Sequence, residues 1–163
     1  MLIISIIACT ALGMLIHEFG HLLVARRCRV LCTELGLGLG PKLFSVNIRN
    51  VCFSLRAIPF GSFVRLEGLG ASAPARQVCI HLGGIAFNLV LGFAAYGTLL
   101  GRINLLIAAG NLVPLYQHDG WKCGLVILRT LMRRKSQPAE WALTFSGGFV
   151  SLVIGWAIMR MFM

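Results

Sequence analysis

The sequence predicts an all-α polytopic membrane protein with about four transmembrane helices and a small membrane-associated antiparallel β-sheet. Hydrophobic residues make up 58% of the 163-residue chain, while charged residues make up only 12%. Such a composition excludes an intrinsically disordered chain and is unusual for a water-soluble domain. Three apolar segments are each long enough to cross the hydrocarbon core of a bilayer, which takes about 20 residues.

The predicted spans divide the chain, which we interpret as a single domain over residues 1–163. The first helix covers residues 1–25, the second 78–100 and the fourth 141–163. A third helix over residues 103–132 is long enough to span a bilayer but is interrupted. The first segment has neither a basic start nor a small-residue cleavage site, so we interpret it as a retained helix and not as a signal peptide.

Between the first two helices, residues 41–67 carry the pattern of a small surface sheet. Two runs alternate apolar with polar side chains: Phe44, Val46 and Ile48, then Val51, Phe53 and Leu55. Arg49-Asn50 is the expected turn between these runs. The glycines that alternate from Gly36 to Gly40 favour irregular backbone or close approach to another chain before the sheet. An amphipathic linker without strands is the alternative interpretation of this segment.

Basic residues give the chain a formal net charge of +10 and gather in two connections. The connection between the first two predicted helices contains Arg26, Arg27, Arg29, Lys42, Arg49, Arg56, Arg65 and Arg76. The connection between the last two contains Arg129, Arg133, Arg134 and Lys135. The positive-inside rule places both connections in the cytoplasm and both termini outside. We therefore expect a bacterial or archaeal plasma membrane, with anionic lipid at the cytoplasmic face as a partner and no nucleic acid.

The main functional signal is His17-Glu18-Phe19-Gly20-His21, inside the first apolar segment. On a helix, His17 and His21 project from one face and can ligate one metal ion. Glu18 flanks that face and can act as general base on a metal-bound water, which is the HExxH zinc signature. Histidines satisfied by neighbours in a buried helix are the alternative. The motif lies roughly 24 Å along the helix, which places the site toward the cytoplasmic side.

A second group of polar residues lies in the interrupted third segment, between Asn111 and Gly120. Pro114 cannot donate a hydrogen bond to the carbonyl of Gly110, so the helix breaks there. Broken helices at membrane depth line cavities. Asp119, the only aspartate of the chain, is then the expected third metal ligand beside the two histidines.

With these residues, the chain resembles the site-2 proteases, a family of intramembrane zinc metalloproteases (peptidase family M50). The resemblance rests on the HExxH helix, Gly40 to Ser45, Ser54 to Pro59, the GxxxN pattern from Gly84 to Asn88, and the N-x-x-P…D-G pattern from Asn111 to Gly120. It implies one Zn²⁺ per chain on His17, His21 and Asp119, with Glu18 as the catalytic base.

The resemblance also implies that the sheet and the regions of Asn88, Asn111 and Pro114 position a substrate. An amide such as that of Asn88 could equally bridge two helices. The chain departs from the family pattern at Tyr116, where a second proline is usual, and at His118, where an apolar residue is usual. It also resembles a minimal form without the PDZ or CBS domain that many members carry.

These features predict a zinc-dependent intramembrane endopeptidase for regulated intramembrane proteolysis. Its expected partner is a single-pass transmembrane protein, cut in or near its membrane helix. A non-catalytic relative that binds membrane helices and a metal-ion transporter are the alternatives. Neither needs Glu18 as a base, whereas a hydrolase does.

Overall fold

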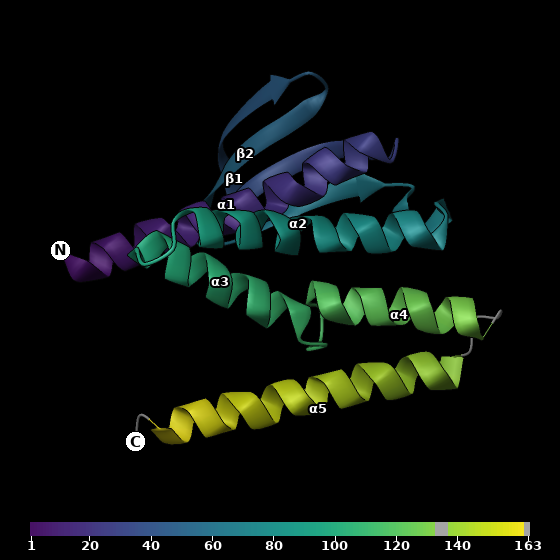
Figure 1. The fold of residues 1–163 in the computed structure, drawn as a ribbon. Helices are drawn as coiled ribbons and strands as arrows, with labels where there is room; N and C mark the ends of the chain where they lie inside the picture. Colours follow the sequence, from purple (N-terminus) through teal and green to yellow (C-terminus); the bar gives the residue numbers. More distant parts are fainter. Residues whose placement is uncertain (133–136, 162–163) are drawn as a thin grey trace.

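The computed structural model describes residues 1–132 and 137–161 of the chain (Figure 1). Its elements are α1 (Leu2–Arg27), β1 (Leu31–Ile48), β2 (Val51–Glu67), a short 3₁₀ helix η1 (Leu69–Ala71), α2 (Pro74–Ala94), α3 (Leu99–Leu112), α4 (Asp119–Leu131) and α5 (Gln137–Met161). The prediction of a helix-rich chain with a small sheet after the first helix is confirmed. The part of the predicted basic connection at residues 133–135 lies outside the described residues.

The two strands form one antiparallel sheet, and both strands are long and bent. Leu35 has Val64 as its Cα partner on one side and Phe53 on the other, so the first part of β1 lies between two parts of β2. The predicted turn is present, with both Arg49 (φ 48°) and Asn50 (φ 66°) in the left-handed region typical of tight hairpins.

The sheet begins at Leu31 and not at residue 41, which corrects the predicted boundary. The alternating glycines were expected to be irregular, but they belong to β1. Gly38 (φ 92°) and Gly40 (φ 86°) adopt conformations that other residues rarely adopt, and they bend the strand without ending it. The glycine content alone predicted irregular backbone. Pairing with β2 instead keeps the segment in the sheet.

The buried carboxylate of Glu34 stabilises the middle of the sheet. Glu34 is only 4% exposed and accepts hydrogen bonds from Ser54 Oγ (2.7 Å) and Arg56 (3.1 Å). Lys42 Nζ lies 3.0 Å from the same oxygen. Burial alone would raise the pKa of the Glu34 carboxyl, but hydrogen bonds from these three side chains lower it to about 2. The carboxylate therefore stays ionised and joins three strand segments.

Helices α1 and α2 pack with their backbones in contact. A methyl group on Gly20 would lie 2.5 Å from the carbonyl oxygen of Gly83, and one on Gly83 would lie 2.9 Å from the carbonyl oxygen of Gly20. Small residues allow such close approach between helices. Both helices are long and apolar enough to cross a membrane, while α3 is a shorter apolar helix. This contact fixes the face of α1 that carries the HExxH motif against α2.

The predicted second helix, over residues 78–100, differs from the observed one at both ends. Helix α2 begins at Pro74, a residue suited to the first helical position, and ends at Ala94. Thr98 then caps α3 by accepting a hydrogen bond from the Gly101 backbone N–H (3.1 Å). The apolar run continues through this turn, so hydrophobicity alone did not reveal it.

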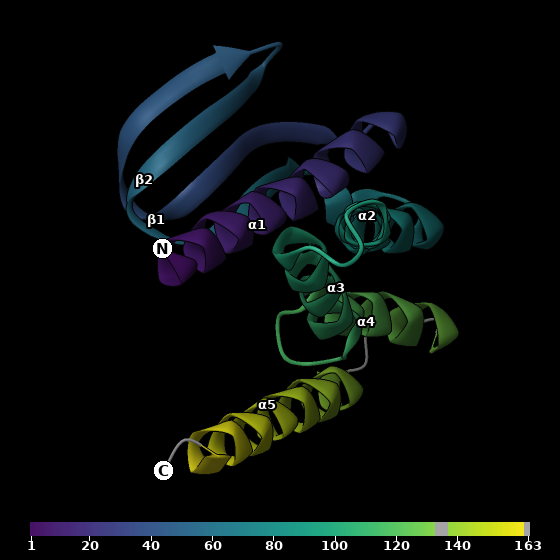
Figure 2. The same ribbon diagram turned by 60° about the vertical axis from the view of Figure 1, so that its left-hand side comes forward.

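The interrupted third segment forms two helices, α3 and α4, with residues 113–118 between them. Figures 1 and 2 show α3 crossing below α1 and α2, and α5 beyond α4 on the far side of the helical group. Helix α5 takes the place of the predicted fourth helix but begins earlier, at Gln137. The break between α3 and α4 brings the start of α4 toward α1.

Candidate metal centre

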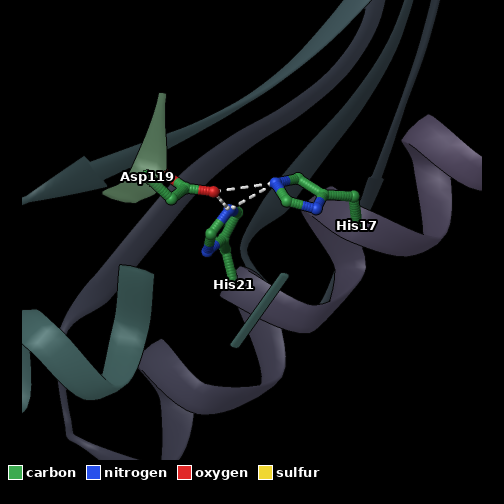
Figure 3. A group of neighbouring side chains, drawn as sticks. All are labelled: His17, His21 and Asp119. Carbon is green, nitrogen blue, oxygen red and sulfur yellow. Dashed lines mark hydrogen bonds and ion pairs between the residues drawn. The ribbon is translucent and has the colours of Figure 1, made fainter. Parts of the chain in front are cut away.

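Three side chains from distant parts of the sequence meet between α1 and the first turn of α4 (Figure 3). Asp119 Oδ2 lies 2.8 Å from His17 Nε2 and 3.0 Å from His21 Nε2. The two Nε2 atoms are 3.1 Å apart. All three residues are buried, and their ligand atoms lie within 4.8 Å of one another. The structure thus brings together the three residues that the sequence predicts as metal ligands.

Helix α2 fixes the two histidines in place. The Nδ1 of His21 is 2.6 Å from the carbonyl oxygen of Ile80. Because a carbonyl can only accept, Nδ1 carries the proton and the lone pair of Nε2 faces the cluster. A methyl group on Gly84 would lie 2.6 Å from His21 Nε2 and 2.8 Å from His17 Nε2. Glycine at this position therefore leaves room for the imidazole rings.

Asp119 is held at the start of α4 by the residues around the helix break. His118 precedes it, and His118 Nδ1 lies 2.9 Å from the carbonyl oxygen of Gly110. This is the carbonyl that loses its helical partner because Pro114 has no N–H. His118 therefore stabilises the break by donating this hydrogen bond, and within the described part of the chain it is not a member of the metal-ligand cluster.

The second carboxylate oxygen of Asp119 has a lysine and a histidine as neighbours, which the sequence analysis did not assign to the site. Lys122 Nζ lies 3.2 Å from Oδ1, and His81 Nδ1 lies 3.6 Å from it. Lys122 could have been found from the sequence, because it is a charge within an apolar helix, three residues after Asp119. His81 could not, since its approach depends on how α2 packs against α4.

A cavity of about 580 Å³ opens beside the cluster. All three cluster residues line it, together with Glu18 and the last segment of β2 from Gly61 to Leu66. Glu18 Oε1 accepts a hydrogen bond from Ser62 Oγ (3.2 Å). The predicted base and the predicted ligands therefore face one space.

The three residues predicted to contact substrate have different positions. Asn111 lines the cavity, and its side-chain amide donates to the Ile107 carbonyl (3.0 Å). Pro114 is exposed in the break and does not line the cavity. Asn88 is fully buried away from the cavity and donates to the Gly13 carbonyl (3.4 Å). In this position the amide joins α2 to α1, which is the alternative that the sequence left open for Asn88.

The donor set fits a zinc ion. In a tetrahedral site with bonds of roughly 2.0–2.1 Å, neighbouring ligand atoms lie about 3.3 Å apart. The separations of 2.8, 3.0 and 3.1 Å here are a few tenths of an ångström shorter. Two neutral imidazoles and one carboxylate are also a donor set found in catalytic zinc sites, where the fourth position stays open for water or substrate.

A family model for peptidase family M50 matches residues 5–101 of the chain. The chain belongs to this family. The match spans α1, the sheet and α2, and it ends just after the start of α3. The HExxH motif is therefore inside the part of the chain that the M50 model recognises. Asp119 is outside it, so the place of Asp119 rests on the geometry of the fold.

Three bacterial relatives are similar to part of the chain. A candidate zinc metalloprotease of Clostridium perfringens is 32% identical over 105 residues, which are 58% of this chain and 31% of the relative. Another, of Fusobacterium nucleatum, is 36% identical over 100 residues, 54% of this chain and 30% of the relative. The zinc metalloprotease RasP of Geobacillus kaustophilus is 42% identical over 66 residues, 40% of this chain and 16% of the relative.

The chain thus spans less than a third of the length of the relatives it matches. Their names specify zinc, and the three-ligand cluster of this chain has suitable donors for that metal. The resemblance seen in the sequence is confirmed at the level of the family. The Zn²⁺ cofactor expected from the sequence agrees with both findings.

Proposed function

We propose that this chain is a zinc-dependent intramembrane endopeptidase, with His17, His21 and Asp119 as ligands of one zinc ion and Glu18 as the catalytic base. One observation carries the proposal. The three ligand atoms and the carboxylate of Glu18 face the same cavity, although Asp119 is 98 residues or more from the others in sequence. A cavity with these four groups has what hydrolysis of an amide needs.

The chemistry divides between the metal and the chain. Zinc, when bound, lowers the pKa of a coordinated water toward about 7 and polarises a carbonyl. The carboxylate of Glu18, which lines the same cavity, would accept a proton from the attacking water. The hydroxyl of Ser62 binds Oε1 of Glu18, which orients the carboxylate on the cavity wall. His21 keeps its proton on Nδ1, against Ile80, and so presents only a lone pair to the ligand cluster.

The substrate we infer is a transmembrane segment that has lost its helical hydrogen bonds locally. Residues 62–67 of β2 pair with residues 31–37 of β1 and form an edge of the sheet beside the cavity. An extended peptide can add to such an edge through its backbone groups. This geometry favours a single-pass membrane protein that is cut in or near its helix, as in regulated intramembrane proteolysis.

The proposed membrane placement is supported by α1 and α2, which are long and apolar enough to span, and by the distribution of basic residues. Four spans correspond to α1, α2, the α3–α4 pair and α5, with both termini outside a bacterial or archaeal plasma membrane. The basic residues between α1 and α2, and Arg129 in the last turn of α4, then lie at the cytoplasmic side, where anionic lipid is a partner. His17 lies in the second half of α1, so the active site opens toward the cytoplasmic side.

The two alternative functions differ from the protease because neither needs Glu18 as a base. A metal-ion transporter needs ligands but no base, and a helix-binding relative without activity needs neither. The bond from Ser62 to Glu18 favours the protease, since it orients a carboxylate that is not part of the ligand cluster. Zinc transport would instead require a continuous path of ligands beyond this cluster.

The decisive experiment compares the wild-type protein with Glu18→Gln in detergent or nanodiscs. Zinc content is measured by elemental analysis, and cleavage with a model transmembrane substrate. We expect about one zinc per chain in both proteins and cleavage only by the wild type. Cleavage by Glu18→Gln at the wild-type rate would exclude Glu18 as the base. Metal transport by a chain that cuts nothing would favour the transporter.

A further inference from the structure

A second pocket, of about 310 Å³, lies at the junction of α1 and the sheet. It is lined by Arg26, Arg29, Val30, Leu31, Cys32, Arg49, Asn50 and Val51. Its three arginines come from the last turn of α1, the link to β1 and the turn between β1 and β2. None of these residues lines the cavity of the metal centre. The pocket is therefore a separate feature of the fold.

The pocket is built by contacts between these segments. The guanidinium of Arg26 donates to the backbone carbonyl of Arg49 (3.4 Å), which connects the end of α1 to the hairpin turn. Arg29 (φ 58°) and Arg49 (φ 48°) both adopt left-handed backbone conformations, which non-glycine residues adopt rarely. Both are local turns: Arg29 follows the end of α1, where the Val30 N–H donates to the Ala25 carbonyl (2.9 Å), and Arg49 opens the hairpin turn. The contact of Arg26 with that turn brings the three positive charges around one space.

The charges of this pocket have no counterions among the described residues. No acidic residue lines the pocket, and none of its three arginines has a carboxylate within 4.0 Å in the described ranges. The neighbouring arginines of the sheet differ, since Arg56 and Arg65 lie 3.1 and 3.7 Å from the carboxylate of Glu34. One arginine group thus has an internal anion, whereas the other has positive charge available for an external one.

We propose that this pocket binds the phosphate group of an anionic phospholipid from the cytoplasmic leaflet. Arginine binds phosphate through paired N–H donors. The end of α1 lies at the level of the headgroups if the membrane placement proposed above is correct, and the proposal rests on that placement. Leu31 and Val51 on the pocket wall offer apolar contact to the glycerol and upper acyl region of a lipid. A bound lipid would anchor the sheet to the membrane surface.

The test removes two pocket charges and compares them with two charges elsewhere on the same face. The pocket variant is Arg29→Gln/Arg49→Gln, which spares Arg26 and its bond to the hairpin. The control is Arg27→Gln/Arg76→Gln, which loses the same charge from the same connection outside the pocket. Binding of short-chain phosphatidylglycerol is measured by titration of the full chain in neutral detergent, with phosphatidylcholine and inorganic phosphate as separate probes.

We expect the pocket variant to bind phosphatidylglycerol about thirtyfold more weakly than the wild type, since each arginine near an anionic surface contributes about 1 kcal/mol. The control should stay within about threefold of the wild type. Phosphatidylcholine and inorganic phosphate should both bind the wild type at least tenfold more weakly. If the double variant does not fold, Arg49→Gln alone replaces it, with an expected loss of about fivefold.

Equal losses in the pocket variant and the control would overturn the proposal, because surface charge in general would then explain binding. Inorganic phosphate that binds as tightly as the lipid would overturn it as well, because the ligand would be a soluble anion. Zinc content and cleavage, measured on the same samples, separate the two proposals. Selective lipid binding by a protein without zinc or activity would contradict only the proposed function.

Discussion

The two sides of the metal centre are built by different forces. On the histidine side, the backbones of α1 and α2 touch at Gly20 and Gly83, and the Ile80 carbonyl fixes the ring of His21. On the aspartate side, Asp119 follows an irregular break and is held by polar neighbours. Packing therefore sets one side, and hydrogen bonds and charges set the other.

This difference predicts how each side responds to change. A packed interface has no free volume, so an added methyl group must displace its neighbours. A polar interface can lose one contact and keep its shape, because the remaining partners still orient the group. Substitutions on the histidine side should therefore act through sterics, and those of the groups that contact the Asp119 carboxylate should act through zinc affinity.

The largest effect is expected for Asp119→Ala. It removes the only carboxylate of the cluster, so zinc affinity should fall by more than about 100-fold, beyond the loss expected for an outer-shell partner. Activity should be lost together with the metal. Elemental analysis after dialysis against a weak chelator measures the zinc that remains bound, and cleavage of the substrate measures the activity. Full zinc occupancy in this variant would contradict the assignment of the third ligand.

A slightly smaller effect is expected for Gly84→Ala on the packed side. Its methyl group would lie 2.6 Å from His21 Nε2, so the imidazoles must shift. We expect a loss of about 1–3 kcal/mol in stability together with reduced zinc content. Gly148→Ala, on α5, is the matched control, because no atom lies within 4 Å of its added methyl group. Thermal unfolding and zinc content that match the control would show that the site is not packed as described.

Removing either Lys122 or His81, the two neighbours of Asp119 Oδ1, should have a moderate effect. Lys122→Met and His81→Leu each leave the other partner of Oδ1 in place. Zinc affinity should fall by about 10- to 100-fold in each variant, as is typical for groups that orient a ligand. Lys42→Met, whose lysine pairs with Glu34 in the sheet, is the control and should keep the wild-type affinity. Competition with a fluorescent zinc chelator measures all three variants.

The smallest effect on zinc is expected for His118→Leu. It leaves the partly buried Gly110 carbonyl without its side-chain donor, and the loss of one such hydrogen bond costs about 1 kcal/mol. The variant should melt at a lower temperature but keep its zinc, since His118 is not part of the described cluster. His118→Gln, which retains a donor, should recover part of the stability. Loss of zinc without loss of stability would instead make His118 a ligand.

Much of the site could be predicted because its residues are rare in an apolar chain. His17 and His21 are four residues apart on one helix, so local geometry alone places them on one face. Asp119 could be identified because it is the only aspartate and follows Pro114, a proline that must break a helix. These inferences need only local rules, and for that reason they did not require the fold.

Other features depend on contacts between segments that are distant in sequence. Gly84 makes room for the histidines only because α2 lies against α1 there. The bond from Ser62 to Glu18, 44 residues apart, requires the last segment of β2 to return to the cavity. Asn88 appeared suited to substrate, yet the rotation of α2 directs it to Gly13. Each of these three contacts depends on the relative rotation and register of two elements. The local sequence does not determine that rotation or register.

The most direct test of the central assignment is the X-ray absorption spectrum of the zinc-loaded protein at the zinc edge. We predict about one zinc per chain with two imidazole ligands, oxygen in the remaining positions and no sulfur. The spectrum of Asp119→Ala, if any zinc remains, should differ in its oxygen contribution. Three imidazoles in the wild type would show that Asp119 is not the third ligand, and a sulfur ligand would contradict the site altogether.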